Sequence, residues 1–293
     1  AHASSPAPLP MTPQHAPIHE TLLPIGRDRT LVAIASQPRT GFARPAVVLV
    51  NAGVIHRVGP HRLHVRLARR LAEAGHLAVR MDLSGIGDSD PLPERLSFRA
   101  SSVADIRTAA DHLTTAASTA AVIVFGICSG ADNALAAAEA DPRIVGLVLV
   151  DPPCYATPGS RNRALRARLR DPQAWRGLPG RLRGRWRERP PTDGSADAQA
   201  ANAGRLPPPQ EVYGRQLETL VERGVRILSV YTAAQGARYN HPEQLFEWFP
   251  TLRGRLDVHY FADANHTLTE LSKQAAFIDL VADWCERQFP ATA

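Results

Sequence analysis

The segment Gly126-Ile127-Cys128-Ser129-Gly130 carries the strongest structural signal in the chain. It follows the apolar run 121–125 (AVIVF) and precedes 131–139 (ADNALAAAE), whose alanines and leucine favour a helix. A strand, a tight turn with small residues on both sides of a nucleophile, and then a helix together make a nucleophile elbow. The sequence therefore predicts an elbow that presents a thiol, where the usual occupant is a hydroxyl.

The spacing of the glycines indicates Cys128, rather than Ser129, as the nucleophile. The strained turn requires small residues two positions before and two positions after the nucleophile. Gly126 and Gly130 flank Cys128 in this way, whereas an isoleucine and an alanine would flank Ser129. We expect the backbone N–H of Ser129 to help bind an oxyanion. The alternative is a buried structural cysteine in a glycine-containing turn, because unpaired cysteines are common in protein cores.

Charge is distributed unevenly along the 293 residues, which carry a net charge of +6. Residues 160–189 contain eleven arginines against only Asp171 and Glu188. Such a local field favours an acidic partner, for example a phosphopantetheinyl carrier protein or the phosphates of coenzyme A. The alternative is a solvated pair of basic helices. No nucleic-acid-binding module is evident, so we expect no nucleic acid as a partner.

The three cysteines, Cys128, Cys154 and Cys285, are an odd number without paired spacing. This pattern fits a reducing compartment, so we expect a cytoplasmic protein. No cysteine or histidine cluster has zinc-finger spacing, and we predict neither a metal nor a cofactor. The longest apolar runs have the length of strands, which is too short to span a bilayer.

Short apolar runs alternate with helix-like segments along the chain. We expect strands at 30–36, 46–50, 76–81, 120–125, 143–150, 226–231 and 257–261. We expect helices at 61–75, 102–117, 131–139, 211–224, 243–249 and 273–288. Strands that are nearly continuously apolar and alternate with helices predict an α/β fold, with a mostly parallel central sheet and helices on both faces.

Composition divides the chain into three parts. Residues 1–17 contain five prolines, and we expect a disordered tail there. Residues 18–154 and 211–293 would form the α/β core. Residues 155–210 interrupt the alternation of strands and helices, first with a basic stretch and then with a segment rich in Pro, Gly, Ala and Asp. We interpret this part as an inserted basic lid with a flexible arm.

The order of these motifs resembles that of the α/β-hydrolase superfamily. The resemblance rests on 51–53 (NAG) after a strand, on 82–89 (DLSGIGDS), on the Cys128 elbow and on His266 after the last strand. Residues 82–89 resemble the D-x-x-G-x-G-x-S turn that is common in this superfamily. More narrowly, 51–62 (NAGVIHRVGPHR) and the Gly-x-Cys elbow resemble bacterial hydrolases of the exosortase-associated and biosynthetic-cluster kind. The resemblance implies an α/β-hydrolase fold with an inserted lid.

His266 is the best candidate for the base, because it lies in a loop just after the expected strand 257–261, late in the chain. From there it can reach the elbow in the order nucleophile, acid, histidine. By analogy with the superfamily, the backbone N–H of Val54 would join that of Ser129 in the oxyanion hole.

The acid departs from the common pattern of the superfamily. Many members place Asp or Glu after the strand that is here 226–231, but 232–240 contain no carboxylate. Cys-dependent Dieckmann cyclases of tetramate and pyridone pathways place their acid after the preceding strand, and this chain resembles them by having Asp151 there. We therefore predict Asp151 as the acid. Asp263, Glu243 or the absence of an acid are the alternatives, since a thiol ionises more easily than a hydroxyl.

A thiol at a helix N-terminus beside an imidazole favours the thiolate, which can attack an acyl carbon. We therefore expect a thioesterase or esterase that acts through an acyl-Cys128 intermediate. The substrate would be an acyl thioester, carried by coenzyme A or by an acidic carrier protein. An acyltransferase or Dieckmann-type cyclase is the first alternative, and a non-catalytic binding protein with this fold is the second.

Overall fold

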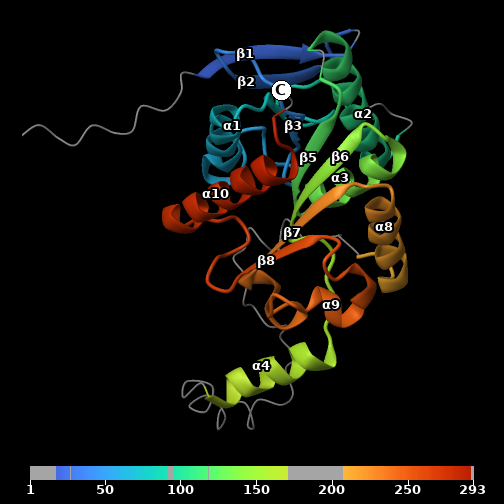
Figure 1. Cartoon of the computed structure of the whole chain (residues 1–293), viewed down its shortest axis with the longest axis vertical. Coiled ribbons are helices and arrows are strands. Elements are labelled where there is room, and N and C mark those ends of the chain that lie inside the picture. Colours follow the sequence, from blue (N-terminus) through green and yellow to red (C-terminus); the bar gives the residue numbers. More distant parts are fainter. Residues whose placement is uncertain (1–17, 27, 92–95, 118, 171–206, 292–293) are drawn as a thin grey trace, which may run out of the picture.

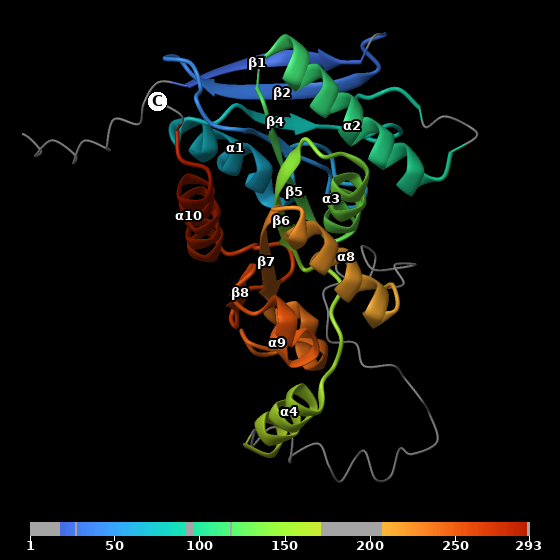
Figure 2. The ribbon, with the colours of Figure 1, turned by 45° about the vertical axis from the view of Figure 1, so that its right-hand side comes forward.

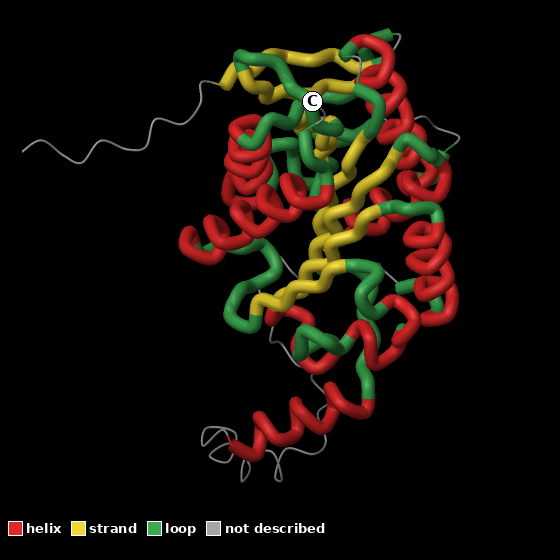
Figure 3. The backbone as a smooth tube through the Cα atoms, in the orientation of Figure 1, coloured by secondary structure: helices red, strands yellow, loops and turns green. Residues whose placement is uncertain are grey.

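The computed structural model describes residues 18–26, 28–91, 96–117, 119–170 and 207–291 (Figure 1). Within these residues, eight strands form one sheet with the order β1-β2-β4-β3-β5-β6-β7-β8. Figure 3 shows the strands as one twisted sheet between helices. The strands are β1 (Ile18–Ile25), β2 (Leu31–Pro38), β3 (Ala46–Leu49), β4 (Ala78–Met81), β5 (Val122–Ile127), β6 (Ile144–Val150), β7 (Arg226–Thr232) and β8 (Asp257–Phe261).

The sheet is parallel from β4 across to β8, whereas β1 and β2 are antiparallel to their neighbours. This arrangement confirms the α/β-hydrolase fold with its mostly parallel sheet. The sequence patterns located seven of the strands but missed β1. That strand lies at the edge of the sheet, and its residues are mostly exposed or half-buried. An edge strand of this kind lacks the continuous apolar run by which the central strands are detected.

Helices cover both faces of the sheet (Figure 2). The helices α1 and α10 pack against each other on one face, while α2, α3 and α8 lie together on the other. The bounds are α1 (Leu63–Glu73), α2 (Phe98–Ala116), α3 (Ser129–Ala140), α4 (Pro158–Arg170), α8 (Gln210–Glu222), α9 (Leu245–Trp248) and α10 (Leu271–Gln288). Three short 3₁₀ helices are η1 (Pro60–Arg62), η2 (Ala233–Arg238) and η3 (Pro250–Leu252).

The alternation of side chains along β3 shows how the sheet separates two cores. Val47 and Leu49 belong to the cluster that contains residues of α1 and α10. Val48 belongs to the cluster that contains residues of α2, α3 and α8. Because successive residues of a strand point to opposite faces, a strand buried on both sides has to be apolar throughout. This is why continuous apolar runs in the sequence predicted the central strands.

Helix α2 begins four residues before its predicted start. The hydroxyl of Ser97 accepts a hydrogen bond from the backbone N–H of Ala100, which caps the helix ahead of Phe98. A serine at this position satisfies one of the N–H groups that have no partner within the first turn. The prediction followed the apolar periodicity, which is weak in this first turn, and overlooked the cap.

Helix α4 follows the carboxyl end of β6 and projects away from the sheet, beyond α9 (Figures 1 and 2). It forms most of the described part of the predicted lid, 155–170 and 207–210. Residues 171–206, which include most of the lid and its arm, and residues 1–17 of the predicted tail lie outside the described residues. The division into core, lid and tail therefore stays a prediction. In the described part of the chain, no helix has the length and apolarity needed to cross a membrane.

Candidate active site

Cys128 sits in a strained turn between β5 and α3, with φ 57° and ψ −120°. A Cβ at Gly126 would lie 2.2 Å from the carbonyl oxygen of Gly130, and a Cβ at Gly130 would lie 2.5 Å from the carbonyl oxygen of Asn51. Both distances are far below van der Waals contact. Glycine is therefore required on both sides of Cys128, because backbone passes where a side chain would otherwise begin. The local geometry is that of a nucleophile elbow.

Asp151 and His266 come together although they are separated by 115 positions in the chain. Nδ1 of His266 lies 2.6 Å from Oδ2 of Asp151, and both side chains are buried. Asp151 also accepts hydrogen bonds from the backbone N–H and the hydroxyl of Thr232, each at 2.8 Å. Three donors on one buried carboxyl group fit an ionised carboxylate, which can only accept. Nδ1 of the imidazole then carries the hydrogen, and Nε2 is left for the opposite side of the ring.

His266 also interacts with the side chain of Cys128. Burial lowers the pKa of His266, but the hydrogen bond to Asp151 and the contact with Cys128 outweigh it and raise this pKa to about 9. The imidazole is thus held in the form that carries a proton on both nitrogens over most of the neutral range. The structure places the side chains of Cys128, His266 and Asp151 in one continuous chain of polar contacts.

The other carboxylates considered for the acid lie elsewhere. Asp263 is exposed and paired with Lys273, and Glu243 is half-exposed and paired with Arg253. Each of these pairs is a surface ion pair rather than a partner of His266. Thr232, by contrast, contacts Asp151 directly, and sequence reasoning assigned it no role. Thr232 is the last residue of β7, and no sequence pattern marks a threonine at that position as a partner of the acid.

The elbow lies beside the loop that follows β3. The backbone N–H of Gly53 donates a hydrogen bond to the hydroxyl of Ser129 at 3.2 Å. Ser129 is the first residue of α3, and backbone N–H groups in the first turn of a helix have no partner within the helix. Val54 is the next residue of the loop, and this residue is 86% exposed. The loop amide with this hydrogen bond to the elbow belongs to Gly53. The oxyanion-hole donor predicted from the sequence was instead the amide of the next residue, Val54.

One cluster in the described part of the chain brings together three groups that could bind a metal: His56, Asp82 and Asp88. The guanidinium of Arg57 already occupies this place, since it forms ion pairs with both carboxylates. A divalent cation would have to displace a positive charge that is hydrogen-bonded on both sides. The residues therefore do not fit a metal centre.

A family model described as "Serine aminopeptidase, S33" matches residues 44–201 of this chain. No curated protein matches the chain in sequence. Among solved structures, the one of DcsB in complex with its substrate analogue is 16% identical, with a TM-score of 0.56, over 92% of this chain and 100% of that chain.

Two further structures have similar statistics. XC6422 from Xanthomonas campestris, described as an a/b serine hydrolase without lid, is 17% identical with a TM-score of 0.54, over 97% of this chain and 100% of its own. A thermophilic esterase from Thermogutta terrifontis is 17% identical with a TM-score of 0.55, over 94% of this chain and 100% of its own. At these identities, the likeness shows a shared fold.

Proposed function

The chain belongs to the serine aminopeptidase S33 family and is an enzyme of the α/β-hydrolase type, and on that premise we propose that it hydrolyses acyl thioesters or esters through Cys128. The observation that carries the proposal is the continuous contact from the Cys128 thiol at the elbow through His266 to Asp151. A nucleophile, a base that touches it and a third group that orients the base are the elements of nucleophilic acyl transfer.

The first half-reaction forms an acyl-enzyme. The thiol proton of Cys128 already resides on His266, and the resulting thiolate attacks the carbonyl carbon of the substrate. The carbonyl oxygen becomes an oxyanion, held by the N–H of Ser129 and by a second amide of the loop after β3. We assign that second amide to Val54, with Gly53 as the alternative. Each such donor typically contributes about 2.7–4 kcal/mol to lowering the barrier. The leaving thiol or alcohol takes its proton from the imidazolium as the old acyl bond breaks.

The second half-reaction releases the acyl group. In the acyl-enzyme, the neutral imidazole of His266 removes a proton from water, and the water oxygen attacks the acyl carbon of the Cys128 thioester. The C–S bond breaks, the sulfur recovers the proton, and a carboxylic acid leaves. Asp151 holds the imidazole in the orientation that both steps need, and Thr232 holds Asp151 through two hydrogen bonds.

We further propose that the acyl group arrives as a thioester of coenzyme A or of an acidic carrier protein. A thioester suits a thiol nucleophile, because the bond that is formed matches the bond that is broken and the acyl-enzyme stays activated. The five arginines of α4 supply positive charge near the chain segment that leaves Asp151. Four of them are exposed, while Arg163 is committed to Glu247 and Asn240. Exposed positive charge of this density favours a negatively charged carrier.

Intact-mass spectrometry after mixing with acyl thioesters of increasing chain length tests the proposal. We expect a mass increase of one acyl group on the wild-type enzyme and none on Cys128→Ala. The matched control is Cys154→Ala, which should still form the adduct, because Cys154 lies outside the elbow and its thiol donates a hydrogen bond to Gln235. Loss of the adduct in Cys154→Ala but not in Cys128→Ala would contradict the assignment of the nucleophile.

Identification of the product separates the alternatives. Free acid as the only product supports hydrolysis, whereas transfer to an added alcohol or amine, or ring closure of a β-ketoacyl substrate, would favour an acyltransferase or a Dieckmann-type cyclase. Because the family description names an aminopeptidase, the panel includes an aminoacyl anilide. A wild-type enzyme that forms no acyl adduct with any member of the panel would instead favour a binding protein with this fold.

A further inference from the structure

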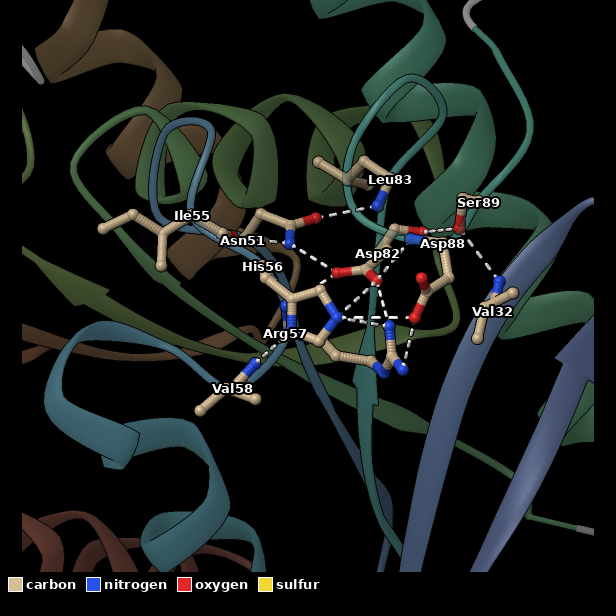
Figure 4. A network of polar contacts seen from close by, with 10 residues as sticks. All are labelled: Val32, Asn51, Ile55, His56, Arg57, Val58, Asp82, Leu83, Asp88 and Ser89. Carbon is tan, nitrogen blue, oxygen red and sulfur yellow. Dashed lines mark hydrogen bonds and ion pairs between the residues drawn. The ribbon is translucent and has the colours of Figure 1, made fainter.

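The loop that follows β3, residues 51–57, is fastened at both of its ends to one carboxylate (Figure 4). The side-chain amide of Asn51, which begins the loop, donates to Oδ1 of Asp82 at 3.0 Å. The backbone N–H of Arg57, which ends the loop, donates to the same oxygen at 2.6 Å. Asp82 is completely buried and comes directly after β4. The loop amides proposed for the oxyanion hole therefore lie between two anchor points on a single side chain.

The Arg57 side chain adds a further contact to the buried carboxylate of Asp82. Its guanidinium is hydrogen-bonded to Oδ2 of Asp82 and lies 2.8 Å from Asp88. Asn51 adds two more contacts, since its amide nitrogen donates to the carbonyl of Ile55 at 2.8 Å and its amide oxygen accepts from the backbone N–H of Leu83 at 2.7 Å. A buried carboxylate with this many donors is strongly localised, because every change of its position breaks several bonds at once.

The same cluster explains the turn at 82–89. A Cβ at Gly87 would lie 2.1 Å from Oδ2 of Asp82, so only glycine leaves room for the carboxylate there. The hydroxyl of Ser89 donates to the carbonyl of Asp82 at 2.7 Å and accepts from the backbone N–H of Val32 at 2.9 Å. The aspartate, the second glycine and the serine of this motif thus all serve to place one carboxylate beneath the loop after β3.

We propose that Arg57 and Asp82 are positioning residues, which together hold the loop that contributes the second oxyanion-hole amide, assigned above to Val54 with Gly53 as the alternative, where the oxyanion develops during acylation of Cys128. This inference rests on the proposed acyl-transfer function. Neither residue touches the elbow directly; both act through the loop, whose Gly53 amide reaches the hydroxyl of Ser129. A donor displaced by about 1 Å can cost about 10²-fold in rate, because the oxyanion is bound by preorganised groups.

The test compares two reactions of the same sulfur. Acylation by a thioester builds an oxyanion, whereas alkylation by iodoacetamide is a displacement at a saturated carbon and needs none. We expect Arg57→Ala to slow single-turnover acylation by about 30- to 100-fold and to leave alkylation of Cys128, followed by peptide mass mapping, within about twofold of wild type. Arg57→Lys, which retains one charge between the carboxylates, should recover part of the acylation rate.

Two variants serve as controls. Arg69→Ala removes an arginine that is ion-paired with Glu20 at the far edge of the sheet, and it should change neither reaction. Asp88→Asn removes the exposed partner of Arg57 but retains the contact with Asp82, and it should slow acylation less than Arg57→Ala. If Arg57→Ala does not fold, as judged by circular dichroism, Arg57→Lys serves in its place. A lower ratio of the acylation rate to the alkylation rate than in the wild type then supports the positioning role.

Equal losses of acylation and alkylation in the Arg57 variants, or no loss of either, would overturn the positioning role. In those cases the wild-type enzyme still acylates, and the proposed function stands. If the wild-type enzyme does not acylate at all while iodoacetamide still labels Cys128, the proposed function fails, and this inference fails with it. The two failures are therefore distinguished by the wild-type reaction alone.

Discussion

At the scale of single residues, the central feature is an imidazole held between a carboxylate and a thiol. The contacts with Asp151 and Cys128 raise the pKa of His266 to about 9, although burial acts in the opposite direction. A proton is therefore retained on the ring at neutral pH, ready for a leaving group. The imidazolium can therefore act as the acid that protonates the leaving group during acylation. The neutral imidazole, which acts as a base, becomes the main form of the free enzyme only above about pH 9.

The direction of this shift fixes the expected pH profile. As the pH rises through about 9, the ring loses its proton, so acylation by substrates with basic leaving groups should decline about tenfold per pH unit above that value. Alkylation by iodoacetamide requires only the thiolate and should not decline over the same range. Stopped-flow acylation and alkylation rates measured in parallel from pH 6 to pH 11 check this expectation, and a decline common to both would contradict it.

The Asp151→Asn variant supplies the matched comparison. Without the carboxylate the pKa of His266 falls, so the decline in acylation should move to lower pH. The rate at the optimum should also fall by about 10²-fold, near the lower end of what general acid–base catalysis contributes, because a thiol needs less assistance than a hydroxyl. An unchanged position of the decline would dismiss Asp151 as the partner that holds the proton on the ring.

Sequence patterns identified the side chains that meet at this site, but not how they are held. Cys128 followed from two glycines at fixed spacing, and His266 from its place after the last strand. Thr232 could not be foreseen, since a threonine at the end of a strand has no distinctive pattern and its role depends on contact with Asp151 across two neighbouring strands. The anchoring of the oxyanion loop by Arg57 was equally hidden, because it depends on distances between segments far apart in the chain.

At the scale of elements, the turn between β5 and α3 depends on close approach of backbone segments. Gly126 and Gly130 are in contact across the turn, and Gly130 also lies against the end of β3. A substitution at either glycine must displace main chain rather than a flexible side chain. The strand, the turn and the helix are thus fixed relative to one another by contacts that no larger residue permits.

We expect Gly126→Ala to destabilise the protein by about 1–3 kcal/mol, the usual cost of inserting atoms into a packed region, and to abolish acylation. The control is Gly254→Ala, because a Cβ at Gly254 meets nothing within 4 Å. It should cost only about 1 kcal/mol, from its positive φ, and leave activity intact. Urea denaturation combined with the acylation assay measures both effects. Equal destabilisation of the two variants would show that crowding at the elbow is not the cause.

The strands could be predicted from the sequence where both faces of the sheet are buried by helices. Strands buried on both faces are apolar throughout, so their positions could be taken from composition alone. The strand β1 escaped because it is solvated at the edge of the sheet, and the start of α2 escaped because it is set by a cap at Ser97 rather than by apolar spacing. A hydrophobic pattern therefore does not detect a solvated edge strand or a helix start that is set by a capping hydrogen bond.

At the scale of the whole molecule, positive charge is concentrated on an element that stands apart from the sheet. Helix α4 projects beyond α9 and carries Leu165 and Leu169 exposed between its arginines (Figure 1). This combination of charge with two exposed apolar side chains suits contact with an acidic protein surface. The net charge of +6 would strengthen the encounter at low ionic strength.

Reversing three exposed arginines of α4 to glutamate should raise the KM for an acyl carrier protein substrate by about 10-fold or more, since each exposed ion pair contributes about 0.2–1 kcal/mol. The KM for a small acyl thioester should stay within about twofold, because it has no acidic surface. The variant combines changes at Arg166, Arg168 and Arg170.

The matched control places the same three charge reversals outside α4. Steady-state kinetics at low and at high salt should then show a salt-sensitive KM for the carrier substrate in the wild type and in the control, but not in the α4 variant. Equal increases of KM in both triple variants would attribute the effect to net charge rather than to α4. The control combines changes at Arg215, Arg226 and Arg255, which are exposed.

The position of His266, in the loop between the edge strand β8 and the final helix, has a consequence for biosynthesis of the enzyme. During translation, the sulfur and the carboxylate emerge from the ribosome long before the imidazole does. A nascent chain that still holds the segment from His266 through α10 in the exit tunnel has a complete elbow but no docked base. Reactivity toward acyl donors should therefore switch on only after this segment has emerged and folded into place.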